Sequence, residues 1–127
     1  MRIHKPALMT ALALVVLLAA ACTAGVGAGT LPLGSYTNDT ASFGPMVLTL
    51  ADGGQYTLSV HNNLIQGTWK VTGDQIELTE TKGGACTNWP ATFKWVLDGN
   101  ALSFALVNDT CLLNATAFDR QTWIRQP

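Results

Sequence analysis

Residues 91–107 read ATFKWVL, DGN and ALSFALV, and this segment says more about the architecture than any other part of the chain. Apolar and polar residues alternate along both arms, which is the period of a half-buried β-strand. Asp98, Gly99 and Asn100 between the arms tolerate the positive φ of a tight turn. The segment therefore predicts a β-hairpin, and its inward-facing residues would be Phe93, Trp95, Leu97, Leu102, Phe104 and Leu106.

Two of the three cysteines lie at nearly equal distances beyond the ends of this hairpin. If the arms pair in register, Cys86 and Cys111 reach adjacent strand ends, within the distance that a disulfide requires. The bridge would close a loop of about 25 residues and would stabilise the fold by about 3 kcal/mol. We therefore predict a Cys86–Cys111 disulfide, which implies an oxidising compartment.

The N-terminus has the features of an export signal. Two basic residues precede an apolar run, residues 7–21, that is short for a membrane span. Residues 17–22 read LLAAAC and resemble the lipobox of bacterial lipoproteins, in which the cysteine carries lipid. The resemblance implies a signal peptide over residues 1–21, lipidation of Cys22 and attachment to the membrane or envelope surface. The alternative is an ordinary signal cut after Ala21 or Ala24, which would leave Cys22 removed or free.

Behind Cys22 the chain is rich in glycine and alanine, so residues 22–32 are expected to form a flexible tether. Seven Lys and Arg residues face eight Asp and Glu residues in the whole chain, and Arg2 and Lys5 lie in the signal segment. The exported part is therefore mildly acidic. This balance argues against nucleic acid as a partner.

The domain expected over residues 33–127 contains short alternating segments separated by turn residues. Eight strands are expected, the last from about Ala117 to Arg125, with no helical pattern between them. Sequential strands with short links give an antiparallel meander. We predict an all-β fold, an eight-stranded up-and-down barrel that leaves no free sheet edge. A two-sheet β-sandwich is the alternative.

The ends of this domain resemble the lipocalin-like, or calycin, family. The residues that carry the resemblance are Gly34-Ser35-Tyr36 on the first strand and an arginine, Arg120 or Arg125, near the last. The segment QGTWKVTGDQI at 66–76 and the paired cysteines look like small bacterial lipocalin-like lipoproteins. The resemblance implies that Tyr36 packs against one of these arginines to close the barrel base.

No catalytic group is evident. His61 is the sole histidine after the signal segment, and nothing around it suggests a base, an orienting group and a nucleophile that converge. Asp52, Asp74 and Asp98 lie in expected turns, whereas Glu77 and Glu80 are expected on the solvent face or at a strand end. We expect no enzyme, no cofactor and no metal site.

The aromatic residues are better candidates for function. Five of them share the inward parity of their strands and would fill the lumen or line a small apolar pocket: Tyr56, Trp69, Phe93, Trp95 and Phe104. The first hypothesis is a barrel that binds a small apolar ligand at the cell envelope. The second is a protein-binding module, such as an inhibitor of a hydrolase or lysozyme, that uses Trp89 and the disulfide-tied loops. A structural envelope lipoprotein is the third.

Overall fold

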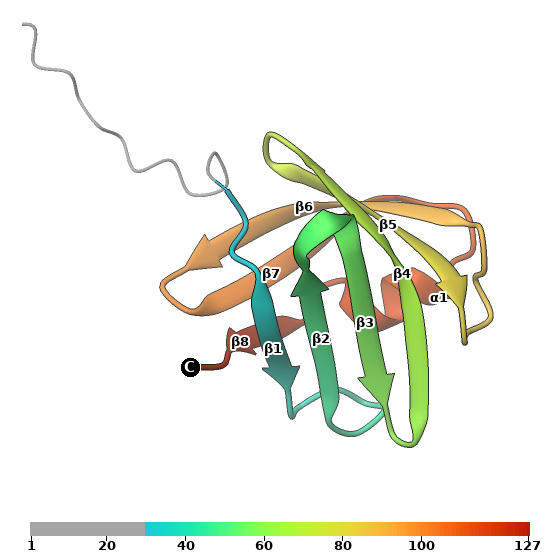
Figure 1. Cartoon of the computed structure of the whole chain (residues 1–127), viewed down its shortest axis with the longest axis horizontal. Helices are drawn as coiled ribbons and strands as arrows, with labels where there is room; N and C mark the ends of the chain where they lie inside the picture. Colours follow the sequence, from blue (N-terminus) through green and yellow to red (C-terminus); the bar gives the residue numbers. More distant parts are fainter. Residues whose placement is uncertain (1–29) are drawn as a thin grey trace, which may run out of the picture.

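A computed structural model describes residues 30–127, so the predicted signal peptide and Cys22 lie outside the described residues. Eight strands form one closed barrel in which each strand pairs with its neighbour in sequence and the first pairs with the last (Figure 1). Every pairing is antiparallel. This confirms the up-and-down barrel and excludes the two-sheet sandwich. The strands are β1 Gly34–Asn38, β2 Met46–Ala51, β3 Gln55–Val60, β4 Asn63–Thr72, β5 Gln75–Lys82, β6 Pro90–Asp98, β7 Ala101–Asp109 and β8 Thr122–Arg125.

The barrel has two different ends. The terminal end carries the start of β1, the turn between β6 and β7, and the last residues of β8. The disulfide end carries the loop of residues 83–89 and the segment of residues 110–121, which contains the short α-helix α1, Leu113–Phe118. A 3-10 helix, η1 Asp52–Gly54, joins β2 to β3 at the terminal end. An even number of up-and-down strands returns the chain to the end where it started.

The predicted hairpin is present as β6 and β7. Asp98 pairs with Ala101, so Gly99 and Asn100 form the turn, and the φ of +61° at Gly99 explains the glycine there. The expected alternation holds except at Leu106, which is 40% exposed. The register of the pair shifts between Thr92 and Phe93, and the side chains of β7 that follow Phe104 are no longer buried.

Helix α1 corrects the prediction of a strand from Ala117 to Arg125, because β8 begins only at Thr122. Phe118 at the end of the helix reaches into the core, where its ring lies 5.6 Å from the centroids of Phe93 and Phe104. It also stacks on Trp123 at 5.7 Å. The helix is thus held by its packing against the barrel interior, since isolated helices of this length are unstable in water.

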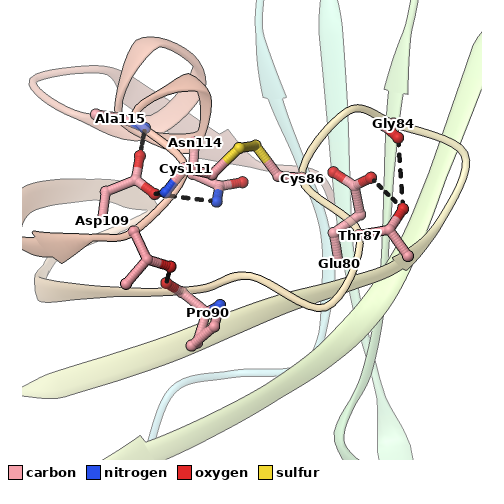
Figure 2. The surroundings of a disulfide bond; sticks show 10 residues. Glu80, Gly84, Cys86, Thr87, Pro90, Asp109, Cys111, Asn114 and Ala115 are labelled. Atoms are coloured by element: carbon pink, nitrogen blue, oxygen red, sulfur yellow. Dashed lines mark hydrogen bonds between the residues drawn. A yellow bond between two sulfur atoms is a disulfide. The ribbon is translucent and has the colours of Figure 1, made fainter.

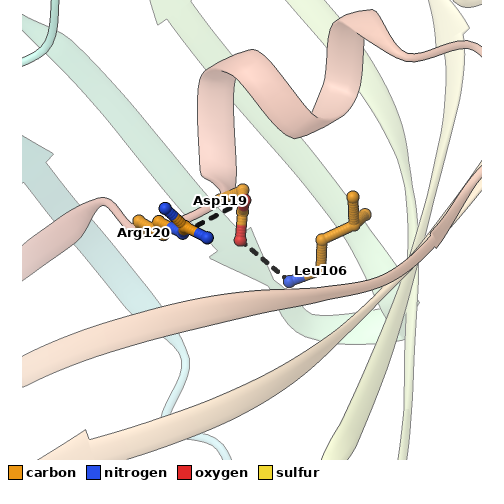
Figure 3. Close-up of polar contacts among 3 residues, drawn as sticks. All are labelled: Leu106, Asp119 and Arg120. Atoms are coloured by element: carbon orange, nitrogen blue, oxygen red, sulfur yellow. Dashed lines mark hydrogen bonds and ion pairs between the residues drawn. The ribbon is translucent and has the colours of Figure 1, made fainter.

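The turn after the helix is fixed by Asp119, whose Oδ1 accepts the amide of Leu106 on β7 at 2.9 Å (Figure 3). Asp119 Oδ2 lies 3.9 Å from Nε of Arg120, whose side chain is 92% exposed. Arg120 has a φ of +58°, and its backbone amide donates to Phe104. Its side chain is therefore directed to solvent and does not pack over Tyr36.

The seam between β1 and β8 closes the barrel with two register pairs, Tyr36 with Arg125 and Thr37 with Ile124. Arg125 also donates to the carbonyl of Leu33 at 2.9 Å. Tyr36 is fully buried, and its hydroxyl donates to the Pro32 carbonyl at 2.7 Å. Of the two arginines named by the resemblance, Arg125 is the one beside Tyr36.

A candidate ligand pocket beside the disulfide

The predicted disulfide is present at the barrel end that also carries helix α1. Cys86 and Cys111 join with Cα atoms 5.8 Å apart and a sequence separation of 25. The bridge ties the loop of residues 83–89 to the segment that leads into the helix (Figure 2). Two segments that follow different strands are therefore held together.

Asp109 positions the start of the helix. Its Oδ2 accepts the amide of Ala115 at 2.7 Å, and its Oδ1 accepts the amide of Cys111 at 3.0 Å and the side-chain amide of Asn114 at 3.2 Å (Figure 2). These bonds satisfy donors that the first turn of a helix leaves free. Leu112 is at the N-cap position of the helix and makes no side-chain capping bond, so the side chain of Asp109 takes the place of an N-cap residue.

Between helix α1 and strands β3, β4 and β5 lies a pocket of about 100 Å³. Its lining is mostly apolar and comes from all of these elements and from the 83–89 loop: Tyr56, Leu58, Ile65, Glu80, Ala85, Cys86, Leu113, Asn114, Ala117 and Phe118. Leu113 is 57% exposed and Ala85 is exposed, so the mouth opens between the helix and the loop. The disulfide therefore connects the two sides of this mouth.

Glu80 supplies the charged group of the pocket. It is only 4% exposed, which corrects the expectation that it faces solvent. Strand β5 extends to Lys82, and Glu80 shares the inward parity of Ile76 and Leu78. Thr87 donates its hydroxyl to Oε1 of Glu80 at 3.1 Å (Figure 2). A methyl group at Gly84 would lie 2.6 Å from Oε2, so the loop backbone packs closely against the carboxylate.

Tyr56 lies beside Glu80 in the pocket. Its ring covers Gly67, the cross-strand partner of both Tyr56 and Glu80, where any Cβ would overlap the ring and the Thr79 carbonyl. Burial raises the pKa of the Tyr56 hydroxyl above its ordinary value of 10.0, and the negative charge of Glu80 raises it further. The hydroxyl is therefore a neutral hydrogen-bonding group at physiological pH.

The other four aromatic candidates do not line this pocket. Phe93 and Phe104 pack edge to face with centroids 5.9 Å apart, in contact with Phe118. Trp95 is buried, and its indole N–H has no partner among residues 30–127. Trp69 is half-buried at the terminal end, where its indole N–H contacts the carbonyls of Ala51 and Gln55. Of the five aromatic candidates, Tyr56 is thus the one that lines the pocket, whereas Phe93 and Phe104 belong to a packed aromatic core.

Trp89 lies outside the barrel, 53% exposed, in a surface depression with Ala85, Thr110 and Cys111. Leu112 and Leu113 are exposed on the neighbouring segment. The predicted partner loops thus do meet at the disulfide end and present apolar side chains to solvent.

Sequence reasoning missed Glu80 and the residues of helix α1 that line the pocket. The alternation Ile76, Leu78, Glu80 could have placed the carboxylate inside. The helix residues gave no such signal, because six residues cannot show helical periodicity.

Comparisons with models of known protein families, with curated proteins and with solved structures find no match. Within residues 30–127, no helix is long and apolar enough to cross a membrane. No group of three or more potential metal ligands comes together in that same part of the chain. The fold and the site define a closed antiparallel barrel with a small, solvent-accessible pocket at its disulfide end.

Proposed function

We propose that this protein is an exported, lipid-anchored binding protein of lipocalin-like type that holds a small, largely apolar ligand in the pocket beside its disulfide. The observation that carries the proposal is the pocket of about 100 Å³, lined by apolar side chains and open between α1 and the 83–89 loop. Ligand sites are typically apolar concavities with a few polar groups that orient the ligand. Here those groups are Glu80, Tyr56 and Asn114.

The size of the pocket limits the ligand. An engineered apolar cavity of about 150 Å³ takes a benzene-sized guest, so a pocket of about 100 Å³ holds a smaller group. The aromatic core formed by Phe93, Phe104, Phe118 and Trp123 fills the adjoining part of the lumen. A larger molecule would have to leave part of its structure outside the mouth. We propose no catalytic role, since the pocket pairs its one carboxylate with no evident nucleophile or base.

The test is native mass spectrometry of the protein from the host membrane fraction, compared with two variants. Ala117→Leu adds bulk to the pocket lining, whereas Ala105→Leu adds the same bulk to an exposed position on β7. We expect a bound small molecule on the wild type and on Ala105→Leu, and its loss from Ala117→Leu. A ligand retained by a folded Ala117→Leu protein would exclude this pocket. The same spectra would show whether the chain begins with a lipidated Cys22.

A second candidate function is protein binding at the disulfide end, which the exposure of Trp89, Leu112 and Leu113 favours. Exposed aromatic and apolar side chains on a rigid surface are typical of interface anchors. The test is cross-linking in intact envelopes with the wild type and with Trp89→Ala. A cross-linked partner that persists unchanged in Trp89→Ala would count against this surface.

A further inference from the structure

We infer that the pocket beside the disulfide recognises a small organic cation, an alkylated ammonium group, through Glu80. This inference rests on the proposed function, because it specifies the ligand class of the same pocket. Its basis is a carboxylate at 4% exposure in a pocket whose lining contains no lysine, arginine or histidine.

The carboxylate lacks a compensating charge within the part of the chain that the structure describes. The ion pair that the described residues form joins Arg120 to Asp119, on the surface. Within residues 30–127, the Glu80 carboxylate receives one hydrogen bond, from the hydroxyl of Thr87. A buried charge without a partner is strongly unfavourable, and such charges in proteins are usually paired. A cationic ligand would supply the missing partner.

The rest of the lining selects the kind of cation. A calcium ion takes six to eight oxygen ligands, whereas this pocket is lined mainly by aliphatic and aromatic carbon. The rings of Tyr56 and Phe118 lie in the lining together with Glu80. Aromatic rings attract ammonium groups through their electron-rich faces, and aliphatic walls accommodate the alkyl substituents. The combination therefore fits an alkylated ammonium better than a metal ion.

The mouth allows such a group to enter. Ala85 and Leu113 line the pocket and are exposed to solvent, and the carboxylate is held on the loop side by Thr87 and the backbone of Gly84. A ligand whose cationic head is smaller than benzene could place that head beside Glu80 and extend a tail through the mouth.

The experiment compares two probes that have nearly the same shape and differ in charge. Ethanolammonium and 1-propanol, its uncharged isostere in which a methyl group replaces the ammonium group, are titrated into the full chain as the cell processes it, with sodium chloride added to equalise ionic strength. Binding is followed by calorimetry and by the tryptophan and methyl signals in NMR. We expect ethanolammonium to bind at least roughly tenfold more tightly than the isostere.

Two matched variants test whether the charge of Glu80 causes the preference for the cationic probe. Glu80→Gln keeps the shape and removes the charge, whereas Glu77→Gln removes an exposed, outward-facing charge from the same strand. We expect Glu80→Gln to abolish the preference for ethanolammonium and Glu77→Gln to keep it. The probe comparison on the wild type does not depend on the folding of either variant.

The outcomes separate this inference from the proposed function. Equal binding of the two probes to the wild type, or an unchanged preference in folded Glu80→Gln, would overturn the cation inference and leave an apolar pocket. No binding of either probe, together with no small molecule in the native spectra, would overturn both.

Discussion

The carboxylate of Asp109 accepts the backbone amide of Ala115 at 2.7 Å, and this contact joins the end of strand β7 to the start of helix α1. The same side chain also accepts bonds from Cys111 and Asn114. The side chain of Asp109 thus fixes the segment that contains Cys111 of the disulfide and the helix that lines one side of the pocket.

Replacement of Asp109 by alanine should therefore destabilise the protein by about 1–2 kcal/mol, the cost of losing a helix cap. The measurement is the free energy of unfolding from denaturant titration. Asp98→Ala, at the end of β6 beside the hairpin turn, is the control and should change stability by less than about 0.5 kcal/mol. Equal effects of the two substitutions would show that the Asp109 contacts do not stabilise the helix.

The disulfide should contribute both stability and binding. The double variant Cys86→Ser, Cys111→Ser avoids a free thiol, and we expect it to lose about 3 kcal/mol of unfolding free energy. Because the bridge connects the two sides of the pocket mouth, ligand affinity should fall even under conditions where the variant is fully folded. Calorimetric titration at low temperature measures this. An unchanged affinity would mean that the mouth keeps its shape without the bridge.

Glu80 should destabilise the ligand-free barrel. Removal of its buried, uncompensated charge in Glu80→Gln is expected to raise the unfolding free energy of the ligand-free protein by about 1 kcal/mol or more. Glu77→Gln, which changes an exposed residue, should leave it nearly unchanged. Thermal denaturation of the three ligand-free proteins tests this. A folded Glu80→Gln protein that melts earlier than the wild type would contradict the expectation.

Tyr56 should make the fold sensitive to alkaline pH. Its pKa in the folded state is raised above the ordinary value of 10.0, so the folded protein holds this proton more strongly than the unfolded chain does. The corresponding stability is fully present below pH 10 and is lost as the pH rises above it. Denaturation across this range should show a smaller loss for Tyr56→Phe than for the wild type. Parallel losses in both proteins would exclude Tyr56 as the cause.

Much of the fold follows from the sequence, because its signals are local and strong. The alternation of residues 91–107, with Asp98-Gly99-Asn100 between the arms, was sufficient for the hairpin and, through it, for the Cys86–Cys111 disulfide. The short turns between all early strands were sufficient for the meander and the closed barrel.

The parts that were missed depend on tertiary contacts. Helix α1 is held by Asp109 and by the packing of Phe118, and neither contact has a local sequence pattern. The prediction from the sequence puts Glu80 on the solvent face or at a strand end, whereas the parity of its strand puts the side chain inside. The alternation of aromatic residues indicates which face of each strand points into the lumen. It does not indicate which of these side chains pack in the aromatic core and which line the pocket.

The start of β1 and the pocket lie at opposite ends of the barrel. Strand β1 begins and strand β8 ends at the terminal end of the barrel (Figure 1). The pocket lies at the opposite, disulfide end. If the chain is attached through Cys22, as we propose, the attachment point joins the barrel at the end opposite the pocket. Binding at the pocket would then leave the anchored end of the barrel uncovered.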